Sequence, residues 1–136
     1  MSHTPHAAPA FKLAYTIFYV ENVPDTLAFY ERAFGFARKF LHEEGDFGEL
    51  DTGSTSLSFC SHKLLQQTGK TPSHPIAGKP CFEIALTTAD VAAAVIHAVQ
   101  AGASLIQPPE QMPWGQTVAY VADPNGFLVE ICSPMG

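Results

Sequence analysis

The stretch YVENVPDTLAFYERAFGF, residues 19–36, decides the fold because a strand end, a helix and a helix stop follow one another within it. β-branched and aromatic residues dominate the segment that leads into it, so the sequence predicts a strand over residues 11–20. Asn22 can cap a helix, a proline follows in the first turn, and apolar residues then recur every three or four positions. We therefore expect an amphipathic helix over residues 23–34 that ends at Gly35.

Three short extended runs follow this helix, and tight-turn residues separate them. They cover residues 36–43, 47–51 and 54–61, so the first half of the chain has the order β-α-β-β-β. The next segment, residues 62–80, contains three prolines and two glycines with little apolar sequence. We interpret it as a linker and loop.

The same order of elements returns after the linker. An alanine-rich helix, VAAAVIHAVQA over residues 91–101, ends at Gly102. The dipeptide Pro108-Pro109 predicts a loop, and the motif DPNG at residues 123–126 predicts a tight turn. The remaining segments of this half are strand-like: residues 81–86, 104–107, 116–122 and 127–133.

The two halves form an internal repeat. At one constant offset the following residues pair: Tyr15 with Glu83, Val23 with Val91, and Ala33 with Ala101. A four-stranded antiparallel unit with one helix on one face leaves its other face uncovered. Two such units can curl into a mixed sheet whose bare faces enclose a cavity, so we expect an α+β fold of two βαβββ repeats.

Length and composition indicate a single globular domain. The chain has 136 residues, of which 46% are hydrophobic and 15% are charged. A core can form at this size without disulfides or a structural metal. We expect a flexible leader over residues 1–10 and one domain over residues 11–136, with the first repeat at 11–61 and the second at 81–134.

The charge balance excludes nucleic acid as a partner. Lys and Arg number 7 against 13 Asp and Glu, a formal charge of -6, so no basic stripe can neutralise phosphates. No run approaches the ~18 apolar residues of a membrane span, and we expect a cytoplasmic protein without membrane contact. An odd number of cysteines in apolar runs predicts buried free thiols at Cys60, Cys81 and Cys132.

Three motifs carry a resemblance to a known family: residues 19–36, FEIALTTADV at 82–91, and AYVADPNGFLVEICSP at 119–134. In this order they resemble the vicinal oxygen chelate superfamily, which includes glyoxalase I, extradiol dioxygenases, fosfomycin-resistance enzymes and bleomycin-resistance binding proteins. The resemblance covers residues 13–134 and implies a homodimer in which each site can draw residues from both chains. Edge strands in a single acidic domain favour the same assembly.

Metal-using members of this family take four ligands from the first and last strands of the two units. The resemblance places Tyr15, Ser58, Glu83 and Glu130 at these positions, or Leu57 instead of Ser58 if the alignment slips by one residue. Only Glu130 is the usual residue, and no imidazole remains, so we expect no metal cofactor. The alternative is Mg²⁺ or Mn²⁺ held weakly between Glu83 and Glu130 with waters.

Glu83 and Glu130 are the candidate catalytic residues. Two carboxylates a few ångströms apart should share a proton, which raises one pKa. Such a pair can act as a general base or receive a cationic ligand. The alternative is that both lie in water at strand ends, paired with Lys79, Tyr15 or backbone donors.

The candidate ligand-binding residues combine aromatic walls with hydroxyl and amide groups: Tyr15, Phe47, Ser58, Trp114, Gln116 and Tyr120. Our first hypothesis is a metal-independent protein that sequesters a small cationic or aromatic molecule. The second is a lyase, isomerase or epimerase in which Glu83 or Glu130 removes a proton next to a carbonyl, with or without a divalent cation. The third is a degenerate structural or interaction domain. An open pocket of about 300 Å³ or more distinguishes the first two from the third.

Overall fold

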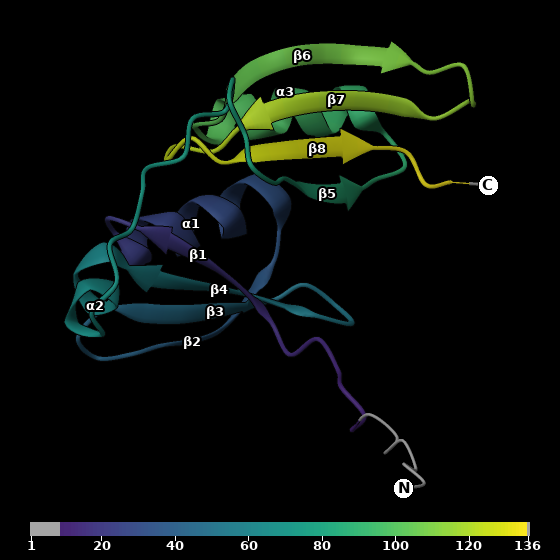
Figure 1. Cartoon of the computed structure of the whole chain (residues 1–136). Coiled ribbons are helices and arrows are strands. Elements are labelled where there is room, and N and C mark those ends of the chain that lie inside the picture. Colours follow the sequence, from purple (N-terminus) through teal and green to yellow (C-terminus); the bar gives the residue numbers. More distant parts are fainter. Residues whose placement is uncertain (1–8, 136) are drawn as a thin grey trace, which may run out of the picture.

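The computed structural model describes residues 9–135, and the first repeat within it has the predicted order of elements (Figure 1). Its elements are β1 (Thr16–Val20), α1 (Val23–Phe34), β2 (Ala37–Leu41), β3 (Phe47–Asp51) and β4 (Ser56–Ser61). The four strands form one sheet in the order β1-β4-β3-β2. Almost all of the leader expected at residues 1–10 lies outside the described residues.

The second repeat builds an equivalent sheet in the order β5-β8-β7-β6. Its elements are β5 (Ile84–Thr87), α3 (Val91–Ala101), β6 (Ser104–Gln111), β7 (Thr117–Ala122) and β8 (Leu128–Cys132). The strand registers match between the repeats, because Ile17 lies opposite Ser58 and Ala85 lies opposite Glu130. The α+β class, the two βαβββ repeats and the mixed sheets are therefore confirmed.

The expectation of antiparallel pairing throughout each unit is wrong for its first strand. β1 pairs with β4, and β5 with β8, in parallel, because the helix carries the chain back across the sheet after the first strand. The first strand is also shorter than predicted, since residues 11–15 are exposed and lie outside the ladder. Residues 81–83 likewise precede β5.

Two predicted loops contain regular structure. The linker at 62–80 begins with a short helix, α2 (His62–Gln67), which starts where the Ser61 side chain accepts a hydrogen bond from the backbone of Leu64. The Pro108-Pro109 segment belongs to β6. Proline is tolerated there because β6 is an edge strand, and its register shifts between Gln107 and Glu110.

Both long helices start and stop as the sequence predicts. Asn22 caps α1 by accepting a hydrogen bond from the Asp25 amide at 2.9 Å, and Gly35 ends it with a left-handed φ of 73°. Asp90 caps α3 through the Ala93 amide at 3.0 Å. Within residues 9–135, none of the helices has the length and hydropathy of a membrane span.

One hydrophobic core joins the two repeats. Helix α1 packs on the first sheet, α3 packs on the second, and the two helices contact each other (Figure 1). The Tyr30 hydroxyl on α1 donates to the Asp123 carboxylate of the second repeat at 2.8 Å, and both groups are buried. Each sheet therefore turns its helix-covered face toward the shared core and leaves its other face uncovered.

Candidate functional site

The uncovered face of the first sheet carries Ser58 in a charge-balanced network. The Ser58 hydroxyl is fully buried and donates to Oε1 of Glu49 at 2.8 Å. The second oxygen of Glu49 lies 3.2 Å from the Lys39 ammonium. Leu57, the alternative at this position, packs in the hydrophobic core instead. Tyr15 lies just before β1 and is 47% exposed.

The uncovered face of the second sheet brings Glu83 and Glu130 together. Tyr120 on β7 lies opposite Glu130 on β8, and its hydroxyl donates to Glu130 Oε1 at 2.9 Å. Glu83 precedes β5, the parallel neighbour of β8, and alternation of side chains puts its carboxyl on the face of Glu130. Within residues 9–135, the partners of the carboxylates are thus each other, Tyr120 and the Cys132 thiol, rather than Lys79 or Tyr15.

The electrostatics of this face follow from that contact. Although Glu83 is exposed as a residue, partial desolvation raises the pKa of its carboxyl, and the charge of Glu130 and a hydrogen bond to it raise that pKa further. The hydrogen bond to Glu130, then burial and the two carboxylate charges, raise the pKa of Tyr120 to about 12. The ionised form of Glu83 is therefore disfavoured, and Tyr120 stays a donor at neutral pH.

Buried thiols lie at matching places on the two faces. Cys60 follows Ser58 by two residues on β4, and Cys132 follows Glu130 by two residues on β8. Burial raises the pKa of both thiols, with that of Cys132 reaching about 11 through an added hydrogen bond to Glu130 and its charge. Neither is an activated nucleophile. The prediction that Cys81 is buried is wrong, because it precedes β5 in an exposed segment.

Two of the aromatic candidates, Trp114 and Phe47, lie apart from the carboxyl pair. Trp114 is 63% exposed in the turn between β6 and β7, and its indole donates to the Gln116 side chain at 2.9 Å. From Gln116 to Tyr120 the strand advances about 13 Å, at roughly 3.3 Å per residue. Phe47 belongs to the other sheet, where its ring stacks on Phe40.

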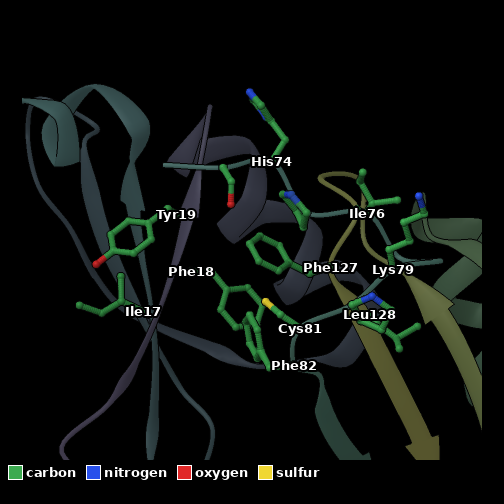
Figure 2. A pocket seen from close by; sticks show the side chains of 14 residues that line it. Ile17, Phe18, Tyr19, His74, Ile76, Lys79, Cys81, Phe82, Phe127 and Leu128 are labelled. Carbon is green, nitrogen blue, oxygen red and sulfur yellow. The ribbon is translucent and has the colours of Figure 1, made fainter. Parts of the chain in front are cut away.

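The eight candidate residues lie outside the best-formed cavity of the described chain. A cavity of about 430 Å³ lies between β1, the segment before β5 and the turn before β8, and none of the eight, all of which are described, lines it. Figure 2 shows the rings of Phe18, Phe82 and Phe127 gathered on its wall, with His74 at one end. This cavity exceeds 300 Å³, but its lining is mainly apolar, with His74 and Lys79 as its charged or titratable groups and no carboxylate.

The family of the chain follows from a match over nearly its whole length. A family model described as Glyoxalase/Bleomycin resistance protein/Dioxygenase superfamily matches residues 12–131. The chain belongs to this superfamily. No curated protein sequence matches it.

Solved structures of the superfamily share the architecture. A glyoxalase-related enzyme from Fulvimarina pelagi is 22% identical with a TM-score of 0.78, over 90% of this chain and 88% of that one. A glyoxalase/bleomycin resistance protein/dioxygenase family enzyme from Burkholderia phytofirmans is 26% identical with a TM-score of 0.72, over 90% and 98%. TioX from Micromonospora sp. ML1 is 21% identical with a TM-score of 0.68, over 90% and 98%. These likenesses establish the superfamily fold and leave the substrate open.

One group of three side chains that could bind a metal lies away from the superfamily's ligand positions, and it is the only such group within residues 9–135. That group consists of Glu21, His62 and His74, whose ligand atoms lie within 4.8 Å of one another. From the sequence, residues 62–80 are interpreted as a linker, and none of these three residues is named as a candidate ligand. The three positions follow no metal-binding spacing, since the fold alone brings residue 74 back to the end of β1.

Proposed function

We propose that this superfamily member binds a small organic cation on the uncovered face of its second sheet, without a metal ion in that site. The charge balance of the Glu83–Glu130 pair supports this. Within residues 9–135, no Lys or Arg nitrogen lies within 4.0 Å of either carboxyl. A partly desolvated carboxylate is costly unless a hydrogen bond or a cation compensates it.

Tyr120 satisfies only part of this requirement. Its hydroxyl occupies one oxygen of Glu130, the Cys132 thiol adds only a weak donor, and Glu83 adds a second carboxyl that competes for a shared proton. An ammonium or amidinium group of a ligand would donate to the remaining carboxyl oxygens and remove the repulsion between the two acids. The exposed position of Glu83 leaves this face open to such a molecule.

The proposal includes a second copy of the chain as the opposite wall of the cleft. In one chain the face of Glu83 and Glu130 and the face of Tyr15 and Ser58 belong to different sheets, each on the side away from the shared core. A homodimer that sets one kind of face against the other would bury both and supply the aromatic wall. Light scattering on the eluted protein should then give twice the chain mass of 14.6 kDa.

The decisive experiment is calorimetric titration with matched probes, each an arylalkyl amine and its neutral alcohol. We expect the amines to bind and the alcohols to fail, because only the former carry a cation. Glu130→Gln and Glu83→Gln should each weaken amine binding about tenfold, or 1.4 kcal/mol. Glu44→Gln, in the exposed turn after β2 and outside both faces, is the matched control and should leave binding unchanged. Undiminished binding by Glu130→Gln would exclude this site.

The chain has one tryptophan, which provides a second readout. If the ligand extends along β7 toward Gln116, Trp114 fluorescence changes on titration, and Trp114→Phe weakens binding. A ligand confined to the carboxyl pair leaves the fluorescence constant.

The raised pKa of Glu83 favours a second candidate function, proton abstraction next to a carbonyl. In this case Glu83 would act as general base and Tyr120 as a neutral donor on the same face. The test is NMR of small ketones and 2-oxo acids in D₂O. Exchange of the adjacent C–H that is catalysed by the protein and lost in Glu83→Gln would establish the enzyme, whereas exchange at the buffer rate leaves binding as the function.

A further inference from the structure

The buried imidazole of His62 is held at the end of β1 by two contacts. Its Nε2 lies 3.1 Å from the backbone carbonyl of Tyr19, and its Nδ1 lies 2.8 Å from Oε1 of Glu21. A carbonyl oxygen can only accept, so Nε2 carries a hydrogen and donates it. The Tyr19 carbonyl therefore fixes the orientation and the tautomer of the His62 ring. Backbone carbonyls commonly do the same for metal-binding histidines.

This tautomer leaves two acceptors facing each other. Neutral His62 with its hydrogen on Nε2 presents a lone pair at Nδ1, and the carboxylate of Glu21 presents another 2.8 Å away. Such a contact needs a cation between the atoms, which is either a proton on the imidazole or a metal ion. A third potential ligand favours the metal ion over the proton, because Nε2 of His74 lies 3.5 Å from the same Glu21 oxygen.

The separations from Glu21 to the two imidazoles fit a common metal ion. Bonds of about 2.0–2.1 Å place two ligand atoms about 3 Å apart at a right angle and about 3.4 Å apart at a tetrahedral angle. The observed separations are 2.8 Å from Glu21 to His62 and 3.5 Å from Glu21 to His74. Two imidazoles and one carboxylate with open positions are a ligand set that transition metals prefer over Mg²⁺ or Ca²⁺.

We infer that Glu21, His62 and His74 form a binding site for a divalent transition-metal ion of the Zn²⁺ type. Glu21 and His74 have side chains 67% and 70% exposed, so the ion reaches the site from solvent and keeps water in its remaining positions. His62 is 6% exposed and anchors the site to the body of the protein. The site lies apart from the superfamily ligand positions at Tyr15, Ser58, Glu83 and Glu130, and does not depend on the function proposed for them.

The ion would join three segments that are separate in sequence. Glu21 follows β1, His62 starts α2, and His74 belongs to the segment between α2 and β5. That last segment also forms one wall of the 430 Å³ cavity, with His74 at its end (Figure 2). Metal binding should therefore fix this wall against β1 and raise the thermal midpoint of the protein.

The test uses untagged full-length protein in which His3 and His6 are replaced by alanine, so that these two residues cannot bind the probe. Zn²⁺ affinity is measured by competition with a chromogenic chelator, and Co²⁺ is added separately to read coordination from its visible absorption. We expect one ion per chain, and no competition by Mg²⁺.

Ligand variants decide the assignment. His74→Ala and Glu21→Gln remove exposed side chains, so both should fold, and each should weaken Zn²⁺ binding at least about tenfold. His42→Ala is the matched control, because His42 is also exposed beside a carboxylate, 4.0 Å from Asp46, and lies outside the site. Equal affinity of all three variants, or the absence of Zn²⁺ binding by the parent protein, would overturn the inference and leave a protonated His62 paired with Glu21.

Discussion

The two repeats place a hydroxyl and a carboxylate at the same pair of sheet positions with their roles exchanged. In the first repeat Glu49 lies on the third strand and Ser58 on the fourth, whereas in the second Tyr120 lies on the third and Glu130 on the fourth. The hydroxyl donates to the carboxylate in both, at 2.8 Å and 2.9 Å. The backbone frame is thus shared, while the chemistry on it has diverged.

The difference lies in what surrounds each carboxylate. Glu49 has the Lys39 ammonium at 3.2 Å, so the first face is internally neutralised. Glu130 has a second acid, Glu83, as its neighbour. Only the second face therefore retains an attraction for an external cation, which is why the ligand is proposed there.

The turns that join the third and fourth strands also differ between the repeats, in burial and in hydrogen bonding. Asp123 in the second repeat is 3% exposed and accepts hydrogen bonds from Tyr30 and from three backbone amides of its own turn. Asp51 in the first repeat is exposed and accepts one, from the Gly53 amide. A Cβ at Gly126 would lie 2.6 Å from the Pro75 carbonyl, whereas one at Gly53 would meet nothing within 4 Å. The second turn is packed and the first is open.

The largest expected effect comes from breaking the packed turn. Asp123→Ala leaves the buried Tyr30 hydroxyl and several amides without an acceptor, and we expect a loss of about 3 kcal/mol in the free energy of unfolding. Asp51→Ala should cost less than about 1 kcal/mol because water replaces its single bond. Urea denaturation of both variants checks the contrast. Equal losses would mean that the buried bond to Tyr30 contributes nothing.

The second prediction concerns proton affinity on the second face. The pKa of Tyr120 is about 12, against 10.0 for an ordinary tyrosine, and the bond to Glu130 is the main cause. Since the folded pKa is raised, the stabilisation is complete below pH 10 and is lost as the pH rises toward 12. Glu130→Gln should lower this pKa toward 10.0, by less than the full hundredfold change in proton affinity because burial and the Glu83 charge remain. Phenolate absorbance at pH 11, with Tyr120→Phe as the blank, measures it; an unchanged spectrum in Glu130→Gln contradicts it.

The third prediction compares the two hydroxyls directly. Ser58 is fully buried, so Ser58→Ala removes a hydrogen bond to a charged group and should cost about 1.5 kcal/mol. Tyr120→Phe should cost less than about 1 kcal/mol, because half-buried Glu130 can take a water in place of the phenol. Thermal unfolding of the two variants at pH 7 measures both losses of stability. A larger loss in Tyr120→Phe than in Ser58→Ala would contradict the prediction that the Ser58 hydrogen bond stabilises the fold more.

Local patterns in the sequence are sufficient for the fold. Asn22, Gly35 and the DPNG motif determine where elements begin and end, and these signals act within a few residues of themselves. The helix at His62–Gln67 was missed because its cap, Ser61, also ends a strand and so reads as part of it. The prolines of β6 were misread because edge position, which makes proline tolerable, depends on the order of strands in the sheet.

The site is harder to predict from local patterns because its contacts join residues that are far apart in the sequence. The closeness of Glu83 and Glu130 was expected from the resemblance to the superfamily, whose ligand positions fall on these two residues. The Lys39 partner of Glu49 and the meeting of Glu21 with His74 were not, since neither follows a spacing rule. Pairings of this kind depend on the detailed course of β2 and of the segment after α2.

The smallest expected effect is a change in the free energy of unfolding when one carboxylate on each face is neutralised. It should have opposite signs on the two faces, because only Glu49 has a cation beside it. The pKa of Glu83 is raised in the folded protein, so the ionised form is disfavoured there. Wild-type protein should therefore lose stability relative to Glu83→Gln as the pH rises above 4.5, the ordinary value for this group. At pH 7 the variant should be the more stable by less than about 1 kcal/mol, because solvent screens an exposed residue. Glu49→Gln should instead lose about 0.5 kcal/mol at the same pH, since it gives up the ion pair with Lys39. Denaturant midpoints for both variants at pH 4 and pH 7 measure the two signs. A destabilised Glu83→Gln at pH 7 would mean that the second face is already neutralised, and the case for an external cation would fail with it.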